Sequence, residues 1–176
     1  DLKQKTENAK HIIIIGGGFI GAEVAEQLAK YSDKVVSLVE MEEYCLFKAF
    51  SKDVACRADE VLRKTNIKLY TNNKVTKIKG ENNQVTSVLL ADGTEMKADL
   101  VIASIGYVPN VGIARECGLP INKNGAIVID RYMRTNVKDV FAVGDCSSTY
   151  GFITGDTDNI MLASTAVAEA RILGYN

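Results

Sequence analysis

The chain has 176 residues, 47% of them hydrophobic and 24% charged, which is the composition of a folded globular protein and not of a disordered one. Its 21 basic and 22 acidic residues give a net charge of −1, which removes the electrostatic basis for general binding to nucleic acid or to an anionic membrane. One histidine and four cysteines, none in a CxxC spacing, exclude a multi-histidine metal site, a zinc signature and a disulfide framework.

The uncharged stretches are too short or too interrupted to span a membrane. The longest near the start covers residues 12–22, whereas a membrane helix needs about 20 residues. The sequence shows no basic-then-apolar leader, and its cysteine usage favours a reducing, cytoplasmic location. Because the first residue is Asp1 and not Met, the sequence leaves open whether the chain starts naturally or is a piece of something longer.

The first part of the chain alternates strand and helix patterns. Residues 1–10 are polar and predict a short helix or a lead-in linker. The β-branched run that follows is typical of a strand buried on both faces, and the next segment spaces Ile20, Val24 and Leu28 along one helical stripe. The expected elements are a strand at residues 12–15, a helix at 19–31, a strand at 35–39 and a helix at 52–65.

Short alternating segments then replace the helical pattern. They lie at residues 68–70, 74–78 and 85–90, and Asp92–Gly93 is a good hairpin turn because Gly tolerates positive φ. Later expected elements are strands at residues 100–103, 127–129 and 140–143 and a helix at 159–173. The fold class predicted is α/β: a Rossmann-like parallel sheet with helices and an inserted antiparallel β-meander.

Three glycines stand between the first strand and the first helix. Gly16, Gly18 and Gly21 form a GxGxxG pattern. The first glycine permits a tight turn, the second lets the backbone approach a pyrophosphate, and the third lets helix and strand pack closely. The helix N-terminus adds unpaired N–H groups and a positive dipole end, so this loop is a candidate dinucleotide site.

Glu40 ends the second expected strand and lies 19 residues after Gly21, close to the spacing of about 20 for an acid that binds an adenosine ribose. A carboxylate there accepts hydrogen bonds from ribose hydroxyls and repels a 2′-phosphate. The following residues, Met41, Glu42 and Glu43, supply no cation for such a phosphate, so the sequence favours NAD(H) over NADP(H). The alternative interpretation is that Glu40 is an ordinary solvent-exposed residue at the end of a strand and binds no ligand.

Other reactive residues are given no catalytic role. Tyr44 and Lys48 match the YxxxK pair of short-chain dehydrogenases, but they lie too early in the chain and we interpret them as a chance match. His11 opens a strand, where a structural role is expected. Nothing in the sequence lowers the pKa of Cys45, which we place in an exposed loop, and Cys146 has no partner cysteine nearby.

Four segments together resemble the flavin-dependent pyridine nucleotide–disulfide oxidoreductases, in particular the branch of NADH oxidases and coenzyme A-disulfide reductases. They are Gly16–Glu23 (GGGFIGAE), Val39–Glu40, Ala103–Asn110 (ASIGYVPN) and Tyr132–Cys146 (YMRTNVKDVFAVGDC). The third departs slightly, because the family often has Ala-Thr-Gly where this chain has Ser104–Ile105–Gly106. They follow the family's order through most of the chain, so the match is specific as a set.

The resemblance implies an NAD domain inserted into an FAD domain. Residues 11–105 would be the NAD(H)-binding domain, residues 106–176 a partial return into the FAD-binding domain, and residues 1–10 a lead-in segment. Glu23 would position the nicotinamide, or else be an ordinary exposed acid at a helix start. Phe19 would cover the nicotinamide pocket, or else pack in the core beneath the loop. The expected cofactor-binding residues are Gly16, Gly18, Phe19, Ile20, Gly21, Glu23, Glu40, Ser104, Ile105, Gly106, Gly144 and Asp145.

The resemblance also says what this chain lacks. The family's first FAD loop, its redox cysteine and its dimerisation domain have no counterpart here, so we expect this chain to bind NAD(H) but to retain FAD poorly or not at all. Asp145 would bind the ribityl chain of FAD in the full-length enzyme. A homodimer would be possible only through the missing C-terminal domain. The partners implied are NADH and the rest of the FAD domain.

The function predicted is presentation of NADH for hydride transfer to FAD in an NADH oxidase or disulfide reductase. One alternative is a regulatory dinucleotide-sensing Rossmann module without catalysis, which would not need the segment at residues 135–145. Another is an ordinary Rossmann dehydrogenase, but neither His11 nor Tyr44 is placed to act as its acid–base residue.

Overall fold

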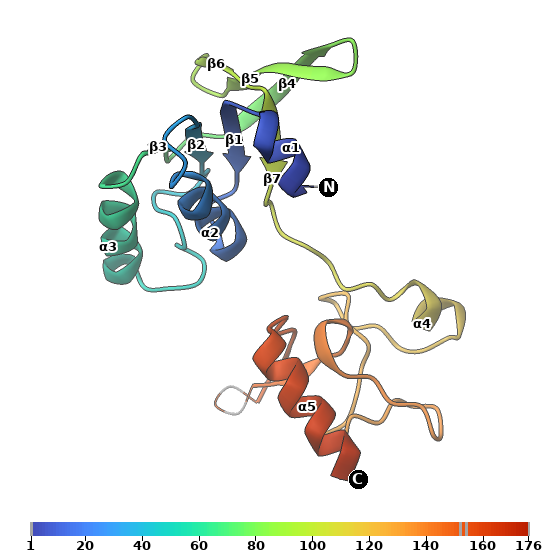
Figure 1. Cartoon of the computed structure of the whole chain (residues 1–176). Coiled ribbons are helices and arrows are strands. Elements are labelled where there is room, and N and C mark those ends of the chain that lie inside the picture. Colours follow the sequence, from blue (N-terminus) through green and yellow to red (C-terminus); the bar gives the residue numbers. More distant parts are fainter. Residues whose placement is uncertain (1, 152, 154, 176) are drawn as a thin grey trace. The chain divides into compact units, whose positions relative to one another are not determined.

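The computed structural model describes residues 2–151, 153 and 155–175. The chain divides into two compact units, one that ends at Gly106 and one that starts at Tyr107 (Figure 1). Among the described residues, no helix is long and apolar enough to cross a membrane.

A four-stranded parallel sheet forms the centre of the first unit. Its strands are β1 (His11–Ile15), β2 (Val35–Val39), β3 (Ile67–Tyr70) and β7 (Leu100–Ala103). Their order is β3-β2-β1-β7, with Ile12 of β1 opposite both Val36 of β2 and Leu100 of β7. The chain leaves β1 towards β2 on one side and returns to β7 on the other, which is the strand arrangement at which ligands bind in open α/β sheets.

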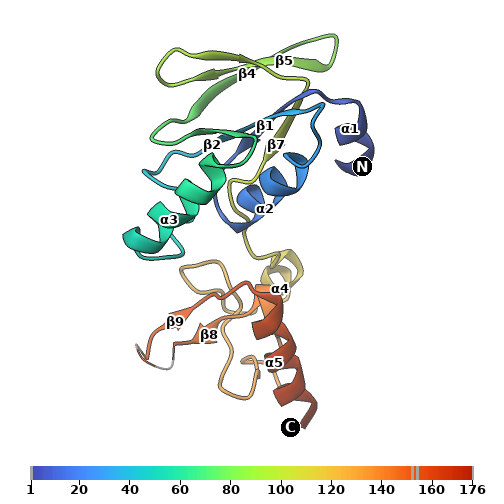
Figure 2. The same cartoon turned by 60° about the vertical axis from the view of Figure 1, so that its left-hand side comes forward.

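The two faces of this sheet are covered by different elements (Figures 1 and 2). Helices α2 (Phe19–Leu28) and α3 (Lys52–Arg63) lie on one face, where Ile12 and Ile14 pack in one core cluster with Ala25 and Leu62. An antiparallel sheet covers the other face, where Ile13 packs with Val88. Its strands are β4 (Val75–Glu81), β5 (Gln84–Leu90) and β6 (Glu95–Lys97), in the order β4-β5-β6. The predicted fold class is therefore confirmed: a parallel Rossmann-like sheet with helices and an antiparallel meander. The segment at residues 68–70, which we expected in the meander, instead forms part of β3 and pairs parallel with β2.

The helix ends differ slightly from those expected. Residues 1–10 contain the short helix α1 (Leu2–Asn8). Helix α2 stops at Leu28 and not at Tyr31, because the Tyr31 N–H turns back to the Leu28 carbonyl at 3.2 Å. Helix α3 ends at Arg63, two residues before the expected end.

The second unit has little regular structure. It contains α4 (Gly112–Glu116), a single 3₁₀ turn η1 (Gly144–Cys146), β8 (Thr149–Tyr150), β9 (Thr157–Asp158) and α5 (Ala163–Tyr175). Its core is built from loop residues as well as helical ones, with Val111, Ala114, Ile127, Ile129, Met133 and Ala142 buried together.

The strands expected at residues 127–129 and 140–143 are wrong. Ile127 makes only isolated bridges, to Ile121 and Ser147, and Phe141 makes one to Arg134. The chain turns too sharply for a longer ladder, because Met133 and Asp139 adopt positive φ values of 60° and 62°. These apolar runs are buried by loop packing, which a periodicity argument cannot distinguish from a strand.

Helix α5 begins four residues later than expected, at Ala163 instead of Asn159. The first helical hydrogen bond that we find there runs from the Ala166 N–H to the Leu162 carbonyl at 3.0 Å. The N–H of Asn159 instead bonds the Asp158 carboxylate at 2.8 Å, in a local turn that competes with helix.

Candidate functional site

A cavity of about 640 Å³ lies beside the glycine loop in the first unit. Its wall combines four stretches, which lie at or after the carboxyl ends of the parallel strands β1, β2, β3 and β7. Predicted site residues in the wall are Gly16, Gly18, Phe19, Glu40, Ser104, Ile105 and Gly106. The sheet topology thus brings together residues that lie up to 90 positions apart in the sequence (106 − 16 = 90).

Each glycine of the loop is needed for a different physical reason. A Cβ on Gly16, which has a φ of +99°, would collide with the Ser104 carbonyl, and a Cβ on Gly21 would collide with the Gly16 carbonyl. A Cβ on Gly18 would meet no heavy atom within 4 Å, so the Gly18 Cα faces open space. The first and third glycines are thus required by packing, and the second leaves room for a ligand to approach the backbone.

The N-terminus of α2 supplies unpaired donors beside this open space. The first intrahelical bond runs from the Ala22 N–H to the Gly18 carbonyl at 2.9 Å. The N–H groups of residues 19–21 precede it and have no acceptor in the helical pattern. Oriented N–H groups and the helix dipole make this end of α2 suitable for an anion such as a pyrophosphate.

Glu40 is almost buried, with 9% of its surface exposed, and it is held in one orientation. Its carboxylate accepts hydrogen bonds from the Gly17 N–H at 2.5 Å and from the Glu42 N–H at 2.8 Å. A carboxylate can accept about four hydrogen bonds in all, so capacity remains for ligand hydroxyls. Glu40 is therefore not simply a solvent-exposed residue at the end of a strand, which was the alternative interpretation.

The loop between β2 and α3 folds back onto the glycine loop. The Leu46 N–H donates to the Gly17 carbonyl at 2.8 Å, and the Cys45 N–H donates to the Asp59 carboxylate of α3 at 2.9 Å. Asp59 is itself buried and also pairs with Arg63 at 3.4 Å. This loop supplies much of the cavity wall beyond the glycines. No sequence motif marked Asp59 as the residue that holds it.

Cys45 is fully buried and is not the exposed loop thiol expected from the sequence. A Cβ on Gly17 would lie 2.6 Å from its sulfur, so the two residues interlock. Burial, with the negative charges of Asp59 and Glu40, raises the pKa of the Cys45 thiol to about 12. The thiol therefore stays protonated at neutral pH and serves packing, not nucleophilic chemistry.

The cavity wall also contains cations that the sequence analysis missed. Lys48 and Lys74 both line it. The Lys48 ammonium pairs with the Glu42 carboxylate at 3.2 Å. Lys48 is not among the residues that directly follow Glu40, but the fold of the loop returns it to the same wall.

Phe19 and Ile20 are more than half exposed at the start of α2, so the alternative of core packing for Phe19 is excluded. The Phe19 ring meets Phe50 edge to face, with the ring centroids 5.7 Å apart. An aromatic face at the rim of the cavity can stack on a planar ligand ring.

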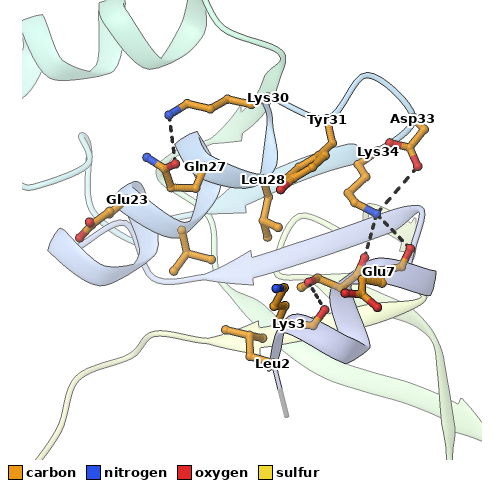
Figure 3. Close-up of a pocket in the computed structure, with 12 residues that line it drawn as sticks. Leu2, Lys3, Glu7, Glu23, Gln27, Leu28, Lys30, Tyr31, Asp33 and Lys34 are labelled. Carbon is orange, nitrogen blue, oxygen red and sulfur yellow. Dashed lines mark hydrogen bonds and ion pairs between the residues drawn. The ribbon is translucent and has the colours of Figure 1, made fainter.

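Glu23 does not line this cavity. It lines another of about 850 Å³, between α1 and α2 (Figure 3). There the Lys34 side chain is 7% exposed and donates to the Thr6 and Ala9 carbonyls at 2.8 and 3.1 Å. This ammonium group satisfies the carbonyls at the C-terminal end of α1 and ties that helix to the loop before β2.

In the second unit, Gly144 and Asp145 lie in the turn η1. The Gly144 N–H donates to the Glu169 carboxylate of α5 at 2.7 Å, and the Ser147 hydroxyl donates to the same oxygen at 3.3 Å. Glu169 is buried and was not predicted as a site residue. It holds the turn against α5 and leaves Asp145 exposed.

Comparison with known proteins places the chain in a family. The sequence profile described as "Pyridine nucleotide-disulphide oxidoreductase" matches residues 1–170. The chain is 33% identical over 175 residues to the NADH oxidase of Streptococcus pneumoniae, covering 99% of this chain and 37% of that protein. It is 35% identical over 174 residues to the NAD(P)H coenzyme A polysulfide/persulfide reductase of Pyrococcus horikoshii. That match covers 99% of this chain and 38% of that protein.

A solved structure shares the fold as well. The water-forming NADH oxidase from Lactobacillus brevis bound to NADH matches with a TM-score of 0.89 and 28% identity, covering 99% of this chain and 38% of that one. The chain thus spans less than half the length of these relatives. Because the profile covers most of the chain and the relatives match it from end to end, this chain belongs to the pyridine nucleotide–disulphide oxidoreductase family.

Proposed function

We propose that the first unit binds NAD(H) for a flavin-dependent NADH oxidoreductase of the oxidase or disulfide-reductase type. Residues 11–105 would form the NAD(H)-binding domain, and residues 106–176 would be part of an FAD-binding domain. The observation that carries the proposal is the convergence of an open Gly18, the donors of α2 and an oriented Glu40 on one cavity of about 640 Å³. The NADH oxidase from Lactobacillus brevis, solved with NADH, shares this fold.

In this proposal the chain's own groups hold and orient the dinucleotide. The N–H groups at the start of α2 bind the pyrophosphate, because the Gly18 backbone is open to it. The Glu40 carboxylate accepts the ribose hydroxyls with the lone pairs that Gly17 and Glu42 leave available. When bound, NADH supplies a hydride from nicotinamide C4 to the flavin, and the protein contributes orientation.

The nicotinamide half would lie towards the segment after β7. Ser104 is fixed there, because its N–H donates to the Ile15 carbonyl at 2.8 Å, and Gly106 turns the chain away with a φ of +100°. Phe19 and Ile20 would flank the ring from the start of α2. Glu23 is left out of these contacts, since it lines the other cavity.

The second unit would contribute to the flavin. Asp145 would accept hydrogen bonds from the ribityl chain in the full-length enzyme, with Gly144 shaping the turn at a φ of +77°. The N-terminus of α5 would direct its dipole towards the isoalloxazine ring, where it favours negative charge.

A Gly18→Ala substitution tests the proposal. The φ of −71° at Gly18 suits alanine, and no heavy atom within 4 Å opposes a Cβ, so the fold should be retained. The methyl group would instead occupy the space in which the pyrophosphate approaches. We expect NADH affinity to fall about tenfold or more, equivalent to about 1.4 kcal/mol, in a fluorescence titration.

Gly112→Ala is the matched control, because Gly112 also faces open space and lies in the second unit. It should leave NADH affinity and the circular dichroism spectrum unchanged. If Gly18→Ala binds NADH as tightly as the parent chain, the glycine loop is not the pyrophosphate site and the proposal is wrong.

A further inference from the structure

The Phe19 side chain stands at the rim of the cavity beside the glycine loop, at the first position of α2. It is 55% exposed, so packing around it does little to select one orientation of its ring. A side chain of this kind has up to three staggered χ1 wells, and ordering it when a ligand binds costs free energy. The orientation that the ring has before binding therefore affects how well the cavity binds a planar group.

The ring of Phe50 supplies a contact that selects one orientation. It meets the Phe19 ring edge to face, with the ring centroids 5.7 Å apart and an angle of 79° between the ring planes. Aromatic pairs favour this arrangement, because the positive edge of one ring faces the negative face of the other. A pair of this geometry covers at most one face of the Phe19 ring, so at least one face remains available to a ligand.

The main chain holds Phe50 in place relative to Phe19. The Phe50 N–H donates to the Leu46 carbonyl at 3.1 Å, and the Leu46 N–H donates to the Gly17 carbonyl at 2.8 Å. Gly17 lies two residues before Phe19 in the chain. The loop that carries Phe50 is thus bonded to the segment from which the Phe19 side chain projects, and the contact between the two rings joins them a second time.

Phe50 acts on the cavity from outside its wall. Of the described residues that line the cavity, residues 46–49 belong to the wall and Phe50 does not. An effect of the Phe50 ring on a ligand therefore passes through Phe19, which does line the cavity. Ile105 and Gly106 line it too, and they follow β7, where the nicotinamide half would lie.

We infer that Phe50 is a positioning residue for the nicotinamide half of NADH: its ring holds Phe19 in the orientation that flanks the nicotinamide. This inference rests on the proposed function and deepens it, because it assigns a residue to one half of the dinucleotide. The pyrophosphate would bind main-chain N–H groups, and the adenosine ribose would bind Glu40. Neither contact depends on the orientation of the Phe19 ring.

The experiment compares NADH with adenosine diphosphate ribose, which keeps the adenosine, the pyrophosphate and the second ribose but has no nicotinamide. Isothermal titration calorimetry gives both affinities for the parent chain and for Phe50→Leu, which retains apolar bulk and removes the ring. Once Phe19 is spread over about three wells, the fraction ready to bind falls to about a third, so we expect NADH affinity to fall about threefold. The affinity for adenosine diphosphate ribose should not change. Phe50→Tyr keeps the ring and should retain the parent NADH affinity.

A double-mutant cycle tests whether Phe50 acts through Phe19. Phe19→Leu should itself weaken NADH binding, and adding Phe50→Leu to it should cause no further loss, because the ring that Phe50 orients is already gone. Phe141→Leu is the matched control. Phe141 is also 44% exposed but lies in the second unit, so both affinities should stay at the parent values.

The inference is overturned if Phe50→Leu weakens the binding of both ligands by the same factor, because the residue would then only support the loop. It is also overturned if NADH affinity does not fall, or if Phe50→Leu keeps its full effect in the Phe19→Leu background. In these cases saturable NADH binding by the parent chain still supports the proposed function. If the parent chain does not bind NADH, the proposed function fails and the inference fails with it.

Discussion

At the scale of single residues, the structure explains why each position of the glycine loop is occupied by glycine. Gly16 and Gly21 are fixed by collisions with neighbouring carbonyls, and Gly17 by the buried sulfur of Cys45. Within this loop, Gly18 alone faces open space. The sequence pattern could predict the roles of Gly16, Gly18 and Gly21, because they follow from the strand–turn–helix geometry. It could not predict that of Gly17, because Cys45 is 28 residues away along the chain (45 − 17 = 28).

His11 also has a structural explanation. Its main-chain N–H donates to the Asp99 carboxylate at 2.8 Å, and its ring nitrogen Nδ1 lies 3.0 Å from the same oxygen. Asp99, the residue before β7, therefore links the start of β1 to the start of β7. The sequence correctly favoured a structural role for His11, but it gave no signal for this partner.

This contact predicts a pH dependence of stability. The hydrogen bond from the His11 main chain, followed by that from its side chain, lowers the pKa of Asp99 below its usual 3.8. A carboxylate whose folded-state pKa is lowered stabilises the fold above the unfolded pKa, and that stabilisation is lost as the pH falls through the folded pKa. Asp99→Asn should therefore unfold at lower urea concentration than the parent chain at pH 7.

Urea unfolding of both proteins between pH 7 and pH 3 checks the prediction. The difference between them should shrink as the pH falls below about 4, where Asp99 in the unfolded parent becomes protonated. A difference that stays constant over the whole range would mean that the Asp99 charge contributes nothing to the free energy of unfolding.

At the scale of elements, the loop between β2 and α3 is the part of the site that sequence reasoning failed to place. Periodicity predicts strands and helices, but this loop is fixed by single contacts, from Cys45 to Asp59 and from Leu46 to Gly17. Leu46 adopts a φ of 60°, which no pattern of apolar residues indicates. The return of Lys48 to the cavity wall follows from this conformation.

Asp59 is the residue in α3 on which the loop depends. In Asp59→Ala the Cys45 N–H would lose its acceptor, and a buried hydrogen bond left unmade costs about 1–3 kcal/mol. We expect weaker NADH binding, since the loop lines the cavity, and a lower urea midpoint. Asp59→Asn keeps an oxygen acceptor and should restore most of the NADH affinity. Equal NADH affinity in the parent and both variants would show that Asp59 does not position the loop.

Elements in the second unit were harder to predict. The apolar runs at residues 127–129 and 140–143 look like strands, yet their backbone pairs one residue at a time around Met133 and Asp139, both with positive φ. Burial without a ladder depends on tertiary packing that periodicity does not encode. By contrast, the main strands and helices of the first unit have longer, regular patterns, which is why their types could be predicted.

At the scale of the whole molecule, the sequence predicted the fold class and the family, and the comparisons confirm both. The predictive signal came from several motifs in the correct order, spread over most of the chain. The candidate site was predicted less completely: the structure adds Gly17, Asp59 and Lys48 and moves Glu23 to another cavity. These residues act through contacts distant in sequence, which single motifs do not contain.

The central claim is that the first unit holds a selective NAD(H) site. A fluorescence titration of this chain with NADH, and with NADPH in parallel, tests it most directly. We expect saturable binding of NADH that clearly exceeds that of NADPH, because the Glu40 carboxylate accepts ribose hydroxyls and repels a 2′-phosphate. Equal affinity for the two, a preference for NADPH, or no saturable binding of either would contradict it.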